Sequence, residues 1–167
     1  MGLFDFINKK EEATNIWEIR DKDEFVMELL GMVEEKCDYG ENMTALNEQE
    51  RIFYIVQQVE MEVNNGGFSQ FFYNDSGNFS NEIVAAFEEI FAYHTAGICR
   101  KAVDAFGGEI PVDRDAREEL MDELECTDES IFDEILDECD EAFYEYKEDL
   151  TKLCYDYAMR NRYSFEK

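Results

Sequence analysis

The sequence has little proline, little histidine, few basic residues and no long apolar run. Pro111 is the only proline among 167 residues. No stretch shows the two-residue alternation of a half-buried strand, so helices with short connections are favoured over a sheet. No apolar run approaches the roughly 18 residues of a membrane span, and no secretory signal is recognisable. We therefore expect an all-α cytoplasmic protein, folded as one compact domain of seven to nine helices in a multi-helix bundle.

The residues that carry most enzyme and metal chemistry are also scarce. The five cysteines are widely spaced and form no CxxC pair, so neither a zinc site nor a disulfide framework is indicated. His94 is the only histidine, and Cys99 would lie off its face of a continuous helix, which argues against a Cys–His nucleophile pair. No acidic loop has EF-hand spacing, and neither glycine pair is followed by the Lys-Ser or Lys-Thr of a phosphate-binding loop. We expect no catalytic residue, no cofactor and no metal site.

Charge is the extreme feature of the composition. The chain carries 42 acidic and 15 basic residues, a net charge of -27. Such a chain repels nucleic acids and anionic membranes and attracts basic protein surfaces and cations. Apolar residues make up 45% and aromatics 14%, which distinguishes the chain from a disordered acidic tail and is enough for a real core.

Apolar residues that recur every 3.6 residues predict a series of helices. They cover about residues 23–37, 48–64, 68–73, 80–91, 93–106, 113–124 and 128–160. Asn47, Ser80 and Thr127 are predicted N-caps, because each has a side-chain oxygen for the first turn of a following helix. The apolar stripe changes face near Asp140, which suggests a break there. Residues 1–20 are amphipathic, and we expect them to pack on a helical body of residues 21–167.

One stretch interrupts the acidic, helix-forming pattern with two glycines, several aromatics and flanking amides. Its key residues are Asn64, Gly66, Gly67, Phe68, Gln70, Phe71 and Asn74. Asn and Gly tolerate the left-handed backbone at a helix end, so a tight helix-to-helix turn is predicted. In the structural interpretation, which we favour, the phenylalanines anchor a short helix and the amides satisfy buried backbone groups. In the functional interpretation, Phe68, Gln70 and His94 surround a pocket.

The acidic residues are concentrated after the single proline. Between Glu109 and Asp149 the chain has 19 acidic and three basic residues. Many acids stand four apart on one predicted helix, and each such pair costs an isolated helix roughly 0.2–0.5 kcal/mol. This block is either a solvated face or a surface selected for its electric field. The candidate partner-binding residues are Asp122, Glu123, Asp133, Glu134, Asp137, Glu138, Glu141 and Glu145.

The stretch from Glu62 to Asn74 resembles the signature of a bacterial family of mostly uncharacterised domains that includes an acidic DNA-mimic protein. Other shared features are Phe106-Gly107-Gly108 before Pro111, and a later Asp140, Phe143 and Tyr144. The resemblance covers about residues 45–160. It implies an all-helical fold and a role in occupying the DNA-binding surface of a transcription regulator. DNA mimicry itself is indicated only by the acidity of this chain.

Three functions remain open from the sequence. The first is a non-enzymatic domain that binds a basic DNA-binding protein as a DNA mimic. The second is an immunity or antitoxin-like protein that neutralises a basic toxin, and the third is a small-ligand-binding helical domain. We expect no direct nucleic-acid binding and no membrane contact. The sequence does not give the oligomeric state, and a dimer stays open.

Overall fold

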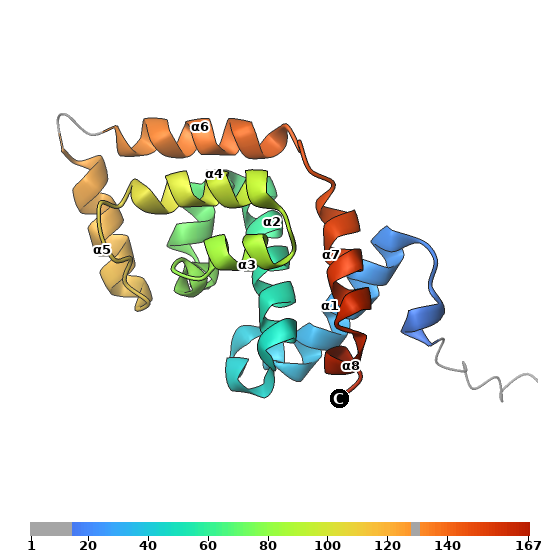
Figure 1. Cartoon of the computed structure of the whole chain (residues 1–167). Coiled ribbons are helices and arrows are strands. Elements are labelled where there is room, and N and C mark those ends of the chain that lie inside the picture. The colour runs from blue at the N-terminus through green and yellow to red at the C-terminus, as the bar shows by residue number, and fades with distance from the viewer. Residues whose placement is uncertain (1–14, 128–130) are drawn as a thin grey trace, which may run out of the picture.

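Helix α2 (Glu48–Tyr73) runs through the middle of the structure and contacts helices along both of its halves (Figure 1). The computed structural model describes residues 15–127 and 131–167, which form one compact, all-α domain without strands. The other α-helices of this part of the chain are α1 (Lys22–Lys36), α3 (Ile83–Glu89), α4 (Tyr93–Asp104), α5 (Arg114–Glu125), α6 (Phe132–Tyr144), α7 (Leu150–Arg160) and α8 (Arg162–Phe165). The predicted fold class is therefore confirmed.

The first half of α2 is fixed by a reciprocal cap. The Asn47 side chain accepts hydrogen bonds from the backbone N–H groups of Gln49 and Glu50, and the Glu50 carboxylate accepts one from the Asn47 N–H. This arrangement satisfies donors that a helix N-terminus otherwise leaves unpaired. The predicted cap at Asn47 is confirmed. Lys36 of α1 binds the same Glu50 carboxylate at 2.8 Å and ties α1 to α2.

Two groups of helices pack on the two halves of α2. Helices α1, α7 and α8 lie together at the N-terminal half, and α1 contacts α7 directly (Figure 1). Helices α3, α4, α5 and α6 pack around the C-terminal half, where α4 and α6 lie side by side (Figure 1). The core between them is rich in aromatics, with fully buried Phe53, Phe68, Phe71, Phe72 and Phe87. Since apolar burial is the main stabilising contribution, α2 is the element that both halves of the core share.

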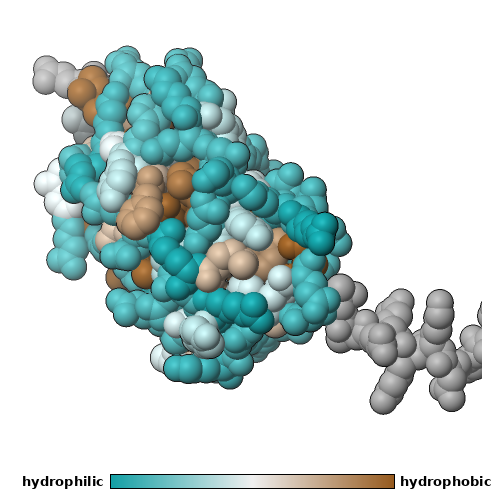
Figure 2. Space-filling model, turned by 45° about the vertical axis from the view of Figure 1, so that its right-hand side comes forward, coloured by the Kyte–Doolittle hydropathy of each residue, from teal (hydrophilic) through white to brown (hydrophobic). Residues whose placement is uncertain are grey.

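Hydrophobic side chains that reach the surface are scattered. On the face seen in Figure 2, hydrophilic residues predominate and lie between the hydrophobic patches. Single exposed apolar residues are normal for globular proteins. In the described part of the chain, no helix is long and apolar enough to cross a membrane. The cytoplasmic location stays a prediction.

Three predicted details of the helix ends are wrong. Ser80 does not cap a helix, because its hydroxyl donates to the Gly77 carbonyl in the last turn of a 3-10 helix, η4 (Asp75–Phe79), and α3 starts at Ile83. Thr127 follows the end of α5, and its hydroxyl donates back to the Glu123 carbonyl. The break expected near Asp140 lies after α6 ends at Tyr144, because Leu136, Cys139 and Phe143 keep one buried stripe.

The segment 1–20 is described only from Asn15 onward. Ile16 is buried in the core and Trp17 packs against Phe25 of α1, with ring centroids 5.4 Å apart. The expected docking of residues 1–14 lies outside the described residues. The division into a segment 1–20 and a body 21–167 stays a prediction.

Candidate functional site

The glycine pair divides α2 into two helical segments that meet at a kink, because Gly66 and Gly67 have non-helical backbone angles. Gly67 has φ 78° and ψ 180°, a conformation that favours glycine. The turn frees the backbone N–H of Phe68, which donates to Asp140 of α6 at 2.7 Å. A Cβ atom at position 67 would collide with the same carboxylate. The motif is therefore a kink that α6 holds from outside, and the short following helix that the sequence predicts is the last part of α2.

Two tyrosines near the end of α6 secure the other side of this kink. The Tyr144 hydroxyl donates to the Val63 carbonyl at 2.7 Å. The Asn64 amide donates to the Tyr146 hydroxyl at 2.5 Å, and that hydroxyl donates to Glu60 at 3.0 Å. The amide of Asn64 thus binds a side chain rather than a buried backbone group, which corrects the predicted role.

The other two amides of the motif hold a carboxylate. Gln70 donates to Glu62 at 2.6 Å, and Asn74 donates to both Glu62 oxygens at 3.1 and 3.3 Å. Ser76 lies 3.3 Å from the same group and also donates to the Phe71 carbonyl. Glu62 has no basic partner among the described residues. We call these four side chains the Glu62 cradle: Glu62, Gln70, Asn74 and Ser76.

Backbone groups at the C-terminus of α2 are satisfied by a buried arginine. Arg117 of α5 is 0% exposed, and its guanidinium donates to the carbonyls of Phe72, Asn74, Pro111 and Val112 and to the Asn78 side chain. Carbonyls at a helix C-terminus carry partial negative charge, which stabilises a cation there. A Cβ atom at Gly77 would collide with this guanidinium. Arg117 therefore locks α5 to the end of the motif.

The phenylalanines of the motif behave as the structural interpretation predicts. Phe68, Phe71 and Phe72 are 0% exposed. Phe68 packs edge-on against Phe143 of α6, and Phe72 packs edge-on against Phe106, with centroid distances of 5.9 and 4.8 Å. Such aromatic pairs contribute beyond their buried area. Fully buried Phe68 cannot line an open pocket.

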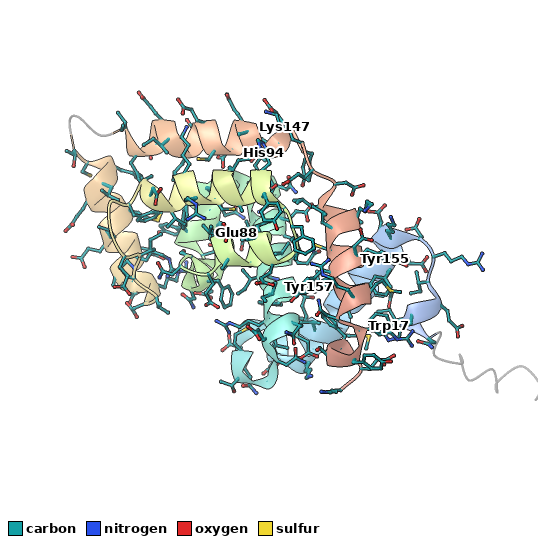
Figure 3. All side chains as sticks on the ribbon, viewed as in Figure 1. Trp17, Glu88, His94, Lys147, Tyr155 and Tyr157 are labelled. Atoms are coloured by element: carbon teal, nitrogen blue, oxygen red, sulfur yellow. The ribbon has the colours of Figure 1, made fainter. Side chains whose placement is uncertain are left out.

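His94 lies away from the Glu62 cradle. It is in the first turn of α4, beside the end of α6 (Figure 3), and its backbone N–H and that of Thr95 donate to the Glu148 carboxylate at 3.0 and 2.9 Å. The predicted pocket with Phe68 and His94 together is therefore not formed. A separate cleft of about 640 Å³ lies beside the cradle, and neither residue lines it.

The eight acidic residues proposed as a partner-binding face are all exposed. Five of them belong to α6 and Glu145 is its C-cap residue, and Figure 3 shows side chains of α6 that project away from the rest of the molecule. Glu138 pairs with Lys101 of α4, and Glu145 pairs with Lys147. Within the described residues no hydrogen bond or ion pair holds the carboxylates of Asp133, Glu134, Asp137 and Glu141. We call the six the α6 face: Asp133, Glu134, Asp137, Glu138, Glu141 and Glu145.

The acidic surface continues from α6 onto the end of α5. Burial raises the pKa of Glu125, and the nearby carboxylates of Asp133 and Asp122 raise it further. Helices α5 and α6 contact each other directly, which brings these carboxylates close together. The sequence prediction had placed both helices in one acidic surface.

Comparison with known proteins identifies the family of this chain. The family described as DMP19-like protein matches residues 44–161. The chain belongs to the DMP19-like protein family. No curated protein and no solved structure matches it. The matched range of the DMP19-like family starts before α2 and ends after α7, so it contains the kink, the Glu62 cradle and the α6 face.

Some residues that organise this DMP19-like fold were not identified from the sequence. Arg117 stands in an acidic helix and resembles any solvated base, and Glu62 is one of 42 acids. Asp140 fitted the family pattern, yet its bond to Phe68 spans 72 positions. A base at a buried position of the α5 pattern is the one sequence signal that could have singled out Arg117, because unpaired arginines are rarely buried.

Proposed function

We propose that this protein acts by binding rather than by catalysis, and that the α6 face occupies the DNA-binding surface of a basic protein. Family membership supports the fold, whereas the charge on α6 supports the mode of action. The main observation behind this proposal is that four carboxylates of one helix face solvent without a basic partner in the described residues.

The charge density of the α6 face is close to that of a DNA strand. From Asp133 to Glu145 a helix rises about 18 Å, and it presents six carboxylates over that length. This is about one charge per 3 Å, against roughly one per 3.4 Å along one strand of B-DNA. Lys101 and Lys147 offset two of the six. The remaining four lie between Asp133 and Glu141, over about 12 Å of helix, which is again about one charge per 3 Å, so the face resembles one strand more than a whole duplex.

A helix face with charges of one sign is destabilised by repulsion between them, and such a face is not needed to keep the helix soluble. Asp133, Asp137 and Glu141 repeat at four-residue spacing, where like charges destabilise a helix. A mixture of acids and bases would keep the same face in water without that repulsion. Attraction of a positively charged partner supplies a reason for the single sign.

Three of the five cysteines are poorly suited to act as nucleophiles, which agrees with a binding function. Burial raises the pKa of the Cys99 and Cys154 thiols strongly, and raises that of Cys139 to about 11, so these thiols stay protonated.

Capture from an extract of the native host tests the proposal. The full chain is immobilised, proteins that bind it are eluted with increasing salt, and the eluted proteins are identified. We expect a DNA-binding protein that leaves at moderate salt, because exposed charge pairs are screened beyond about 10 Å at 0.1 M. The captured protein should also release labelled duplex DNA when the acidic chain is added.

Two results would oppose the proposal. Recovery of no nucleic-acid-binding protein would contradict it, as would a captured protein that holds DNA and this chain at the same time. Recovery of a basic toxin would instead favour the immunity function.

A further inference from the structure

A polar cleft lies on the side of α2 that carries the Glu62 cradle. Its volume is about 640 Å³, within the range of small-molecule sites. The turn around Tyr39 and Gly40 forms one wall, α2 contributes Tyr54, Gln58 and Glu62, and η4 contributes the opposite wall. None of the acidic residues of the α6 face lines it.

The cradle presents a negative charge to this cleft in a fixed orientation. Three neutral side chains, Gln70, Asn74 and Ser76, lie within 2.6–3.3 Å of the Glu62 oxygens. Neutral donors orient a carboxylate but leave its charge in place. Glu41 and Asp75 add carboxylates to the same walls, so a cation is the complementary ligand.

Tyr54 is the independent sign that the cleft accepts a ligand. This residue is only 4% exposed and lines the cleft, and its hydroxyl, which solvent reaches, makes no hydrogen bond to a described residue. Burial raises the pKa of Tyr54 to about 12, with further contributions from Cys37 and Glu34, so the phenol remains neutral at physiological pH. A neutral phenol oxygen can accept a hydrogen bond from an N–H group of a ligand.

Aromatic rings complete a site for an organic cation. Tyr39 stands at the rim, and Tyr54 packs edge-on against Phe79 at 5.9 Å inside the cleft. The Arg51 guanidinium already lies 5.4 Å from the centroid of the Phe79 ring, so these rings offer apolar surface to the uncharged part of an organic cation. Arg114 is the one basic residue on the walls, and Glu118 and Asp75 already pair with it at 2.7 and 3.3 Å. Its charge is therefore largely offset.

We propose that this cleft binds a small organic cation with an ammonium or guanidinium head group. The head group donates to the Glu62 carboxylate and to the Tyr54 hydroxyl, and its apolar part lies against the rings of Tyr39 and Phe79. The family motif then has a second role. Besides forming the kink, it supplies Glu62, Gln70 and Asn74, which build and orient the binding carboxylate.

Titration of the full, isotopically labelled chain followed by NMR tests the site. The probes are butylguanidinium and butylammonium, which differ only in the head group, with 1-butanol as the uncharged analogue. The titrations use about 150 mM salt to suppress general counterion binding. We expect saturable one-site binding of at least one cation, with shifts at Gly40 and at the side-chain amides of Gln58 and Asn74. Shifts spread over the acidic surface without saturation would overturn the proposal.

Two variants and a matched control make the result specific. Tyr54→Phe removes a hydroxyl without a partner in the protein, so the melting temperature should stay the same while cation binding weakens about tenfold. Glu62→Gln removes the oriented charge and should abolish saturable binding. Glu28→Gln removes one exposed carboxylate of α1 and should leave binding unchanged. Equal affinity in all three variants would show that the cleft is not the site.

Discussion

The kink region and the α6 face both carry charged side chains. Those at the kink are hydrogen-bonded within the protein, whereas most of those on the α6 face are not. At the kink, Asp140 and Glu62 accept hydrogen bonds from neutral donors and Arg117 donates to neutral carbonyls. On the α6 face, Asp133, Asp137 and Glu141 point to solvent and make no such bonds in the described residues. Charges at the kink thus define the structure, whereas charges on α6 are free for a partner.

This difference predicts that mutations at the kink and mutations on the α6 face change the free energy of unfolding in opposite directions. Removal of a charge at the kink leaves buried polar groups without a partner, which costs free energy. Removal of a charge from the α6 face relieves repulsion between like charges and should stabilise the fold.

The largest expected effect is at Arg117. In Arg117→Met, four carbonyls lose their donor in a buried place, so we expect a loss of about 3–5 kcal/mol in the free energy of unfolding. Urea unfolding followed by circular dichroism measures it. Arg117→Lys should also be strongly destabilised, since lysine lacks the planar fork that reaches all these acceptors. A loss below about 1 kcal/mol in both variants would contradict the role of Arg117.

The next largest effect is at Gly67. Gly67→Ala places a methyl group against Asp140 at a backbone φ of 78°, and we expect a loss of about 2–4 kcal/mol. Gly97→Ala in α4 is the matched control, because a Cβ atom there meets no atom within 4 Å. That variant should be neutral or more stable by up to about 1 kcal/mol. Similar melting temperatures for the two variants would show that the kink is not constrained.

A change of pH is expected to have a smaller effect on the free energy of unfolding. Burial raises the pKa of Glu60 and of Asp140, although hydrogen bonds from Tyr146 and from Phe68 partly oppose the shifts. A raised folded-state pKa means that the folded chain binds protons more readily than the unfolded chain. The free energy of unfolding should therefore rise as the pH falls from neutral toward mildly acidic values.

The stabilisation should not continue to strong acid. Burial opposes ionisation of Glu148, but hydrogen bonds from His94 and Thr95 together outweigh it and lower the pKa of this carboxyl. Protonation of Glu148 therefore removes stability as the pH falls further. Urea unfolding at several pH values shows the trend. Glu60→Gln should flatten the slope between neutral and mildly acidic pH. An unchanged slope in this variant, with Glu28→Gln as control, would contradict the assignment.

The smallest expected change in stability comes from a mutation on the α6 face. Asp137→Asn keeps the shape and removes two like-charge pairs at four-residue spacing, so we expect a gain of about 0.5–1 kcal/mol. Thermal unfolding at low salt measures it, and the gain should shrink at high salt. A loss of stability would show that Asp137 has a structural partner.

The helices could be predicted because their apolar periods are local, as in α1 and in the first part of α2. The kink was predicted because Gly66 and Gly67 are rare interruptions of a helical pattern. The contacts that hold the kink could not be predicted, since Asp140 and Arg117 lie 72 and 45 positions from their backbone partners. The start of α6 was also missed, because a threonine near a helix end can donate backward as Thr127 does.

Charge reversal tests the central claim, that the unpaired carboxylates of α6 bind a basic partner. The variant Asp133→Lys, Asp137→Lys, Glu141→Lys is compared with Glu24→Lys, Glu28→Lys, Glu35→Lys, which makes the same charge change on exposed positions of α1. Affinity for the captured partner is measured by calorimetry at one salt concentration. We predict that the α6 variant binds at least about 100-fold more weakly and the α1 variant within about tenfold of the parent. Equal weakening in both variants would show that only the net charge matters and would contradict a defined α6 binding face.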